Sequence, residues 1–491
     1  MHKSKLIDIL KSFSPEEVKS FADFITSPYF NKNKTLIKFF IELKKAYPGF
    51  LQERMDKKKL YSKIFSGKKY NEQVFKNLSS ELIGLSKEFL ETEYYRKNIN
   101  DRKLNLINHL NEKRLDSIFA TEANNFGQTL LESGKLSDPH FYYLYKLEES
   151  NIGFHLERNE QPLVFDKVLK SGEHLVLFFM LHLTKTISNL IVNRISFNTS
   201  FEANLPEEFL NNLDIVKLIR YMKQKGIKHS NIIELYYLMV LCNMKPENES
   251  YYYKFKNLLF ENIDSYNRDI IYGLFNALET YCTQKINSGN KKFTEEFFHL
   301  FKTEIQSGFY KFSESSPVTF MKFRNTYLTA LRLKKFDWVE KFINEFKNDL
   351  IESDRDNILE MAYAQINFEK KNFEKAIGHL QNVKTDQFFL KVDVKNISLM
   401  AYYELNYTEP LISLIDSYKH FLTDNKFLTD EYKENNLRFV NALYALTTLQ
   451  EKNDKNKIAE LKDKILKFTN DRKTEWLLEK IKLVEENNIE K

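Results

Sequence analysis

The stretch from Ile358 to Val383 reads ILEMAYAQINFEKKNFEKAIGHLQNV, and it indicates the fold more directly than any other part of this sequence. Its apolar residues recur at helical spacing on both sides of the polar pair Lys371-Asn372. The pattern predicts two amphipathic helices that fold back on each other across a turn of a few residues. Because such a pair cannot bury its apolar stripe alone, it requires neighbouring pairs of the same kind.

The composition of the whole chain favours an all-α fold. Among 491 residues, 42% are apolar, and 42 Phe and 27 Tyr supply large side chains for a core. Only 12 Gly and 9 Pro interrupt the chain, whereas a sheet-rich protein of this length needs many more turn breakers. The length exceeds that of a usual single core, so we expect several domains or one extended array.

The carboxy-terminal third contains an internal repeat. Leu331, Phe368 and Tyr403 occupy matching places, separated by 37 and 35 residues. The same two intervals separate two further sets, which are Val339, Ala376 and Leu411, and Ile343, Leu380 and Ile415. A variable period near 34 residues is typical of degenerate helix-pair repeats.

Residues 363–383, YAQINFEKKNFEKAIGHLQNV, resemble a tetratricopeptide repeat. Small Ala364 and Ala376 stand where that family's helices approach closely, Phe368 stands between the helices, and Lys371-Asn372 makes the turn. The resemblance covers about residues 319–425 and departs from the family in the turn, where Lys371 and Asn406 replace the usual glycine. It implies helix hairpins stacked into an α-solenoid whose surface binds another molecule.

The first 100 residues carry the positive charge of the chain. They hold 20 Lys and Arg against 12 Asp and Glu, whereas the remaining residues hold 54 against 56.

The segments SPYFN at 27–31 and IFSGKKYNE at 64–72, with the long helix that follows, resemble helical proteins of bacteria whose function is uncharacterised. That resemblance implies no activity. Ser14 to Glu17 predicts a capping box, and Asp56 and Asn71 predict two further helix starts.

The two helices predicted around Gly67 fit a helix-turn-helix, and they also fit an ordinary αα-hairpin, which is the far commoner arrangement. The second helix offers no Arg able to read bases. Nucleic acid would therefore be held by charge, and the candidate phosphate contacts are Lys57, Lys58, Lys59, Lys68, Lys69 and Lys76. The alternative is that these lysines form a solvated surface.

A partner groove is predicted on the first helix of the central repeat. Some tetratricopeptide proteins hold a carboxyl terminus with Lys and Asn on this helix. The corresponding face of this chain offers Met361, Gln365 and Phe368 instead. The resemblance therefore implies a more apolar groove for a partner helix or an extended peptide.

No motif for catalysis, a cofactor or a metal is recognisable. The ten His form no H-E-x-x-H pattern, although His174 and His182 are eight apart, and Cys242 and Cys282 form no C-x-x-C. The amino terminus lacks a signal peptide, and the longest apolar run, Leu175–Leu183, is far shorter than the roughly 20 residues of a membrane span. We expect a cytoplasmic, non-enzymatic protein without a cofactor or a membrane anchor.

The sequence thus predicts three parts: a basic helical domain at 1–100, a helical array at 101–313, and a tetratricopeptide-like solenoid with closing helices at 314–491. The expected function is a scaffold or adaptor that binds a protein partner through a helical-repeat surface. The alternative is a regulator whose basic amino-terminal domain binds nucleic acid. The identity of the partner and the oligomeric state stay open.

Overall fold

The fold is taken from a computed structural model that describes residues 4–132, 135–196, 203–425, 429–452, 455–468 and 471–487. These residues form 24 α-helices, four short 3₁₀-helices and two isolated β-bridges, so the chain is all-α as predicted. It divides into two compact units. The amino-terminal unit comprises Met1–Leu130 and Lys146–Val168, and the carboxy-terminal unit comprises Leu131–Tyr145 and Leu169–Lys491. The chain passes from one unit to the other after residues 130, 145 and 168, and not at the predicted boundaries of 100 and 313.

The amino-terminal unit is built on a cluster of phenylalanines. Phe21 is fully buried, and its ring centroid lies 5.4 Å from that of Phe13, 4.8 Å from that of Phe40 and 5.2 Å from that of Phe89. Phe13 directly follows the first helix of the unit, and Phe21, Phe40 and Phe89 lie on its second, third and fifth helices. The helices of this unit are α1 (Lys5–Ser12), α2 (Pro15–Thr26), α3 (Lys34–Lys44), α4 (Lys57–Ile64), α5 (Glu72–Lys97), α6 (Ile99–Glu112), most of α7 (Asp116–Glu132) and most of α8 (His140–Glu157).

The helix starts of this unit follow the predicted caps. The Glu17 amide donates to Ser14 Oγ at 3.1 Å, and the Ser14 amide donates to Glu17 Oε2 at 2.9 Å, which completes the capping box of α2. Asp56 Oδ1 accepts from the Lys59 amide at 2.8 Å at the start of α4. Each cap satisfies an amide that has no partner within its own helix.

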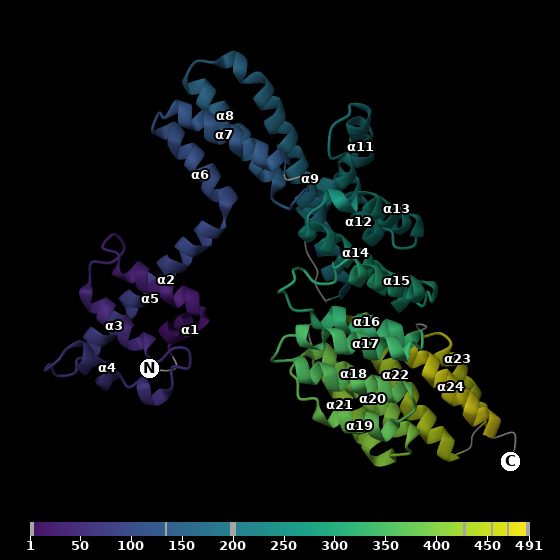
Figure 1. The fold of residues 1–491 in the computed structure, drawn as a ribbon. Coiled ribbons are helices and arrows are strands. Elements are labelled where there is room, and N and C mark those ends of the chain that lie inside the picture. Colours follow the sequence, from purple (N-terminus) through teal and green to yellow (C-terminus); the bar gives the residue numbers. More distant parts are fainter. Residues whose placement is uncertain are drawn as a thin grey trace. The chain divides into compact units, whose positions relative to one another are not determined.

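Most helices of the carboxy-terminal unit pack on their neighbours in chain order. Figure 1 shows these helices laid one after another, with α23 and α24 (yellow) beside them. The helices are α9 (Phe165–Ser196), α10 (Leu205–Asn211), α11 (Ile215–Gln224), α12 (Ser230–Met244), α13 (Glu249–Asn262), α14 (Arg268–Asn287), α15 (Lys292–Gln306), α16 (Phe320–Arg332), α17 (Phe336–Phe346), α18 (Arg355–Glu369), α19 (Phe373–Asn382), α20 (Phe388–Glu404), α21 (Thr408–Asp424), α22 (Asp430–Lys452), α23 (Lys455–Ile465) and α24 (Arg472–Asn487). The first four residues of α9 belong to the amino-terminal unit.

Four successive hairpins of this unit share one turn geometry. In each pair, one residue with positive φ lies two residues after the end of the first helix: Gly289 at 89°, Lys334 at 55°, Lys371 at 61° and Asn406 at 58°. In each turn this residue donates its amide to the carbonyl three residues earlier, and the following amide donates to the carbonyl five residues earlier. This is the Schellman arrangement of a helix end.

The turns confirm the sequence repeat. The carbonyls that accept from Lys334, Lys371 and Asn406 belong to Leu331, Phe368 and Tyr403. These three residues therefore occupy equivalent places in three hairpins. Ile286 takes the same place in the α14–α15 pair, 45 residues before Leu331, and the longer interval explains why the sequence repeat did not extend to it.

Replacing Lys371 with glycine is expected to stabilise the protein by about 0.5 kcal/mol. A left-handed conformation strains any residue with a Cβ, and glycine relieves this strain at the cost of a more flexible unfolded chain. Lys375→Gly is the matched control, because Lys375 is an exposed lysine inside α19 where glycine should cost about 1 kcal/mol. Urea denaturation measures the stability of both variants. Equal losses of stability in the two would contradict the claim that the left-handed conformation strains Lys371.

Helix α9 is longer than the apolar run seen in the sequence. By length and composition alone, the segment Gln161–Arg194 is able to span a membrane, and 39% of its most apolar window is buried. Its second half makes polar contacts with the carboxy-terminal unit: Ser188 Oγ accepts from Asn243 on α12 at 2.8 Å, and Lys185 pairs with Asp138 at 2.9 Å. These contacts attach the second half of α9 to other parts of the carboxy-terminal unit.

Candidate functional site

An open groove of about 1040 Å³ lies along the hairpin turns of the carboxy-terminal unit. One side is formed by turn residues and helix ends of successive pairs, and the other side is α24. We call it the turn groove. It is lined by Ile286, Gly289, Lys291, Lys292, Thr294, Glu295, Arg332, Leu333, Lys334, Phe368, Glu369, Lys371, Phe373, Glu404, Asp471, Arg472, Glu475, Trp476, Glu479, Lys480, Lys482, Leu483 and Glu486.

Helix α24 is fixed across the ends of α18 and α20 by polar contacts. Arg472 donates to both oxygens of Glu369 at 3.0 Å each, in a bidentate pair. The indole nitrogen of Trp476 donates to Glu404 Oε1 at 2.8 Å, and Lys480 Nζ lies 2.6 Å from the same oxygen. These contacts join residues 103, 72 and 76 positions apart in the chain.

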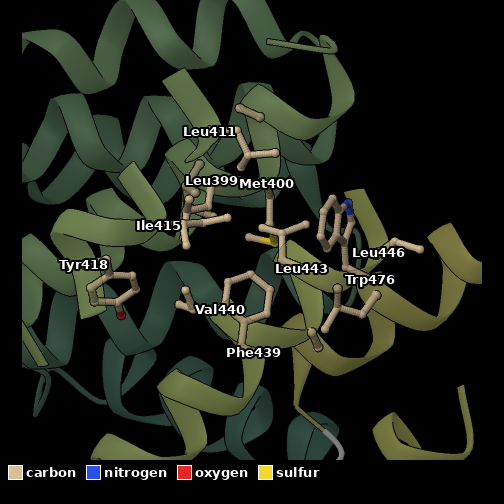
Figure 2. Packing of buried hydrophobic residues seen from close by; sticks show 14 of the residues in the cluster. Leu399, Met400, Leu411, Ile415, Tyr418, Phe439, Val440, Leu443, Leu446 and Trp476 are labelled. Carbon is tan, nitrogen blue, oxygen red and sulfur yellow. The ribbon is translucent and has the colours of Figure 1, made fainter. Parts of the chain in front are cut away.

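Trp476 anchors α24 in the hydrophobic core. Its side chain is 2% exposed, and its ring centroid lies 5.4 Å from that of Tyr403 and 6.5 Å from that of Phe439. Figure 2 shows Trp476 with Leu446 and Met400 in the same packed layer as Phe439. One wall of the turn groove is therefore a helix that both core packing and ion pairs hold in place.

The cations of the turn groove divide into paired and unpaired groups. Lys291 pairs with Glu475 at 2.7 Å, and Lys292 lies 3.7 Å from Glu249. Three further cations are the side chains of Arg332, Lys334 and Lys371. Within the described residues these three make no ion pair and no side-chain hydrogen bond, and all three are exposed.

Arg332 differs from the two lysines in its surroundings. It reaches solvent at the groove, but protein atoms surround it closely enough that loss of hydration, with the nearby Arg324, lowers the pKa of its guanidinium. Asp471 and Glu475 on α24 act in the opposite direction, and neither reaches it in an ion pair. Arg332 is thus a crowded guanidinium that has no carboxylate partner among the described residues.

The partner groove predicted from the sequence is not an open surface. Met361, Gln365 and Phe368 are only 0%, 9% and 5% exposed. The helix that carries them, α18, packs directly against α16 and α20, so that these side chains fill the contacts between successive first helices. Phe368 borders the turn groove, which opens at the ends of these helices and not on the predicted face.

The six candidate phosphate-contacting lysines lie around α4 and the start of α5. All six are exposed: Lys57, Lys58, Lys59, Lys68, Lys69 and Lys76. Lys76 lies 3.5 Å from Glu72, and Lys68 Nζ lies 5.8 Å from the ring centroid of Phe65. The other four make no ion pair within the described part of the chain.

A buried ionic cluster joins α14, α15 and α16. Lys322 Nζ lies 2.5 Å from Glu279 Oε1, 2.7 Å from Glu304 Oε2 and 3.1 Å from Asn276 Oδ1. Burial and the neighbouring Glu279 raise the pKa of the Glu304 carboxyl well above its ordinary value. The two carboxylates outweigh the effect of burial and raise the pKa of Lys322. The cluster connects helices on both sides of the predicted boundary at residue 313, so packing continues across that boundary.

The structure does not bring His174 and His182 together. His182 packs on Phe178, with ring centroids 4.6 Å apart, whereas His174 lies near His140 and His229. Burial and the other histidines lower the pKa of His140 to about 4, and burial, His229 and Lys170 lower that of His174 to about 4. In the described part of the chain, no group of three or more His, Cys, Asp or Glu is arranged to hold a metal ion.

The two histidines should make the carboxy-terminal unit sensitive to acid. Because their folded pKa values of about 4 lie below the unfolded value of 6.5, the unfolded chain binds protons first. Stability is complete above pH 6.5 and falls as the pH decreases towards 4, by about 3 kcal/mol for each histidine. Urea midpoints from pH 7 to 4.5 measure this, and the His140→Leu, His174→Leu double variant should lose less stability over that range.

The two cysteines are buried structural residues. Cys242 and Cys282 are 3% and 0% exposed, and burial raises the pKa of the Cys242 thiol to about 12. Neither thiol is therefore activated as a nucleophile.

The chain was compared with known proteins. No protein-family model matches it, and the search of curated proteins found no similar sequence.

Proposed function

We propose that this protein is a non-catalytic cytoplasmic scaffold or adaptor that binds a protein partner along the helix hairpins of its carboxy-terminal unit. The hairpins would form an α-solenoid of the tetratricopeptide-like kind. The turn groove is the observation that carries the proposal: about 1040 Å³ of open space bordered by three successive turns, by Glu404 at the end of α20 and by α24. A groove that several repeats build together offers an extended surface to a peptide or a helix.

Several features support partner binding at this place. The turns that form one side share a single backbone geometry, so their side chains are held at regular positions. The opposite side, α24, is fixed by Trp476 and by three ion pairs or hydrogen bonds. A surface with both sides preformed loses little conformational entropy when a partner binds.

A tagged pull-down of the full chain from its own cells, with and without nuclease, tests the proposal. A stoichiometric protein that is retained after nuclease treatment is the expected result. Loss of every protein partner upon nuclease treatment, together with recovery of nucleic acid, would overturn it. A matched variant with Lys57, Lys58, Lys59, Lys68 and Lys69 changed to Gln should retain the partner.

The alternative is a regulator whose amino-terminal unit binds nucleic acid. It is favoured by one observation, the exposed lysines Lys57, Lys58, Lys59, Lys68 and Lys69 around α4, which make no ion pair in the part of the chain that the structure describes. Such binding would weaken steeply with salt and would be lost in the five-lysine variant. Fluorescence anisotropy with a labelled 20-base-pair duplex between about 50 and 200 mM salt distinguishes the two functions.

A further inference from the structure

We propose that the turn groove binds an acidic segment of the partner protein, and that Arg332 is its anchor. This inference rests on the proposed function and adds the chemical class of the partner. It depends on three unpaired cations in the lining of the groove, which outnumber Glu295, the one carboxylate of that lining without an ion pair in the described residues, and on the apolar side chains of the same lining.

Arg332 is the strongest candidate for a direct contact. Its guanidinium lies at the end of α16, has no ion pair or hydrogen bond within the described residues, and loses hydration to the surrounding protein. A planar guanidinium recognises a carboxylate through two parallel hydrogen bonds. The neighbouring Arg472 already makes such a pair with Glu369, whereas Arg332 has its donors available.

The lysines of two adjacent turns extend this positive surface. Lys334 and Lys371 are the positive-φ residues of the α16–α17 and α18–α19 hairpins, and the shared turn geometry places them at equivalent positions. Both are exposed, and neither has an ion pair in the described structure. Carboxylates spaced along a partner segment would meet Arg332, Lys334 and Lys371 from one side of the groove.

The groove also offers apolar surface. Leu483 on α24 is 48% exposed, and Phe373 at the start of α19 is partly buried. A partner segment that presents both carboxylates and leucines therefore suits the groove better than a purely acidic one. Lys482 and Glu486 on the same wall lie 3.7 Å apart and compensate each other.

The test uses the full chain and a fluorescein-labelled peptide of repeated Glu-Glu-Leu units. Anisotropy should show binding of this probe, and the corresponding Gln-Gln-Leu peptide should bind at least about tenfold more weakly. Arg332→Gln should weaken binding of the acidic probe about tenfold. Lys341→Gln is the control, because Lys341 is an exposed lysine on α17 outside the groove, and its affinity should stay within about twofold of the wild type.

A charge reversal makes the test stricter. Arg332→Glu should abolish binding of the acidic probe and should increase binding of a Lys-Lys-Leu peptide above that of the wild type. Arg332 reaches solvent and makes no ion pair or hydrogen bond within the described residues that the substitutions would break, so the fold should be kept in both variants, and circular dichroism checks this. Equal binding of the acidic probe to the wild type and Arg332→Gln would overturn the proposal, and so would absence of binding to the wild type.

Two further measurements separate this inference from the proposed function. The variant with Lys57, Lys58, Lys59, Lys68 and Lys69 changed to Gln should bind the acidic probe as the wild type does. Binding lost in that variant would assign the probe to the amino-terminal unit and overturn the inference. A cellular partner captured equally by the wild type and Arg332→Glu would keep the scaffold function and reject the groove as its acidic site.

Discussion

Replacing Lys322 with methionine is expected to destabilise the carboxy-terminal unit by about 3–5 kcal/mol, because removal of one partner from a buried ion pair leaves charge without compensation. Lys322 is 4% exposed and Glu304 is 0% exposed, so water cannot replace the ammonium group. Loss of the lysine would leave two carboxyls facing each other between α14, α15 and α16. Urea denaturation followed by circular dichroism measures the loss.

Glu304→Gln is the matched control for this prediction. Since burial and Glu279 raise the pKa of Glu304, they lower the cost of its neutral form, and the isosteric amide should cost only about 1 kcal/mol. The loss in Lys322→Met should also be smaller at pH 5 than at pH 8, because protonation of Glu304 removes buried negative charge at the lower pH. If Glu304→Gln lost as much stability as Lys322→Met, uncompensated buried charge would not explain the effect of Lys322→Met.

Replacing Trp476 with alanine is the second large change, with an expected loss of about 3–5 kcal/mol. The indole is 2% exposed, lies among the side chains of Figure 2 and donates to Glu404. Its removal leaves a cavity and frees one of the contacts that hold α24 across the turn ends. Hydrogen exchange should increase most strongly in residues 471–487, and thermal unfolding should shift to a lower temperature.

Trp476→Phe separates the two roles of this side chain. Phenylalanine keeps most of the packing and loses the hydrogen bond, while Lys480 still pairs with Glu404 at 2.6 Å. We expect a loss of about 1–2 kcal/mol for this variant, with little added exchange in α24. Exchange that stays unchanged even in Trp476→Ala would show that ion pairs, and not the core, hold this helix.

Local signals in the sequence predicted the helices and their ends well. Ser14, Asp56 and Asn71 cap the helices that they were expected to start, because a cap depends on residues only three positions away. The repeat of Leu331, Phe368 and Tyr403 gave the register of three hairpins for the same reason, since each turn closes through hydrogen bonds between residues three and five apart.

The sequence located the functional surface less well. An amphipathic pattern shows which side of a helix is apolar, but it does not show which neighbour covers that side. Met361 and Phe368 were assigned to a groove and are in fact packed between successive first helices. No sequence pattern pointed to Arg332. Its lack of an ion pair within the described residues depends on where Asp471 and Glu475 lie, about 140 residues further along the chain.

By itself, then, the sequence determined an all-α chain, its capped helices and the register of its carboxy-terminal hairpins, because these depend on contacts within a few residues. Only the tertiary structure decided that α24 lies across the turn ends, that Lys322 meets two distant carboxyls, and that an open groove remains at the turns. These features join residues from about 18 to more than 100 positions apart. Periodicity and composition carry no information about such distances, because they record the side that a residue faces and not the residue that it meets.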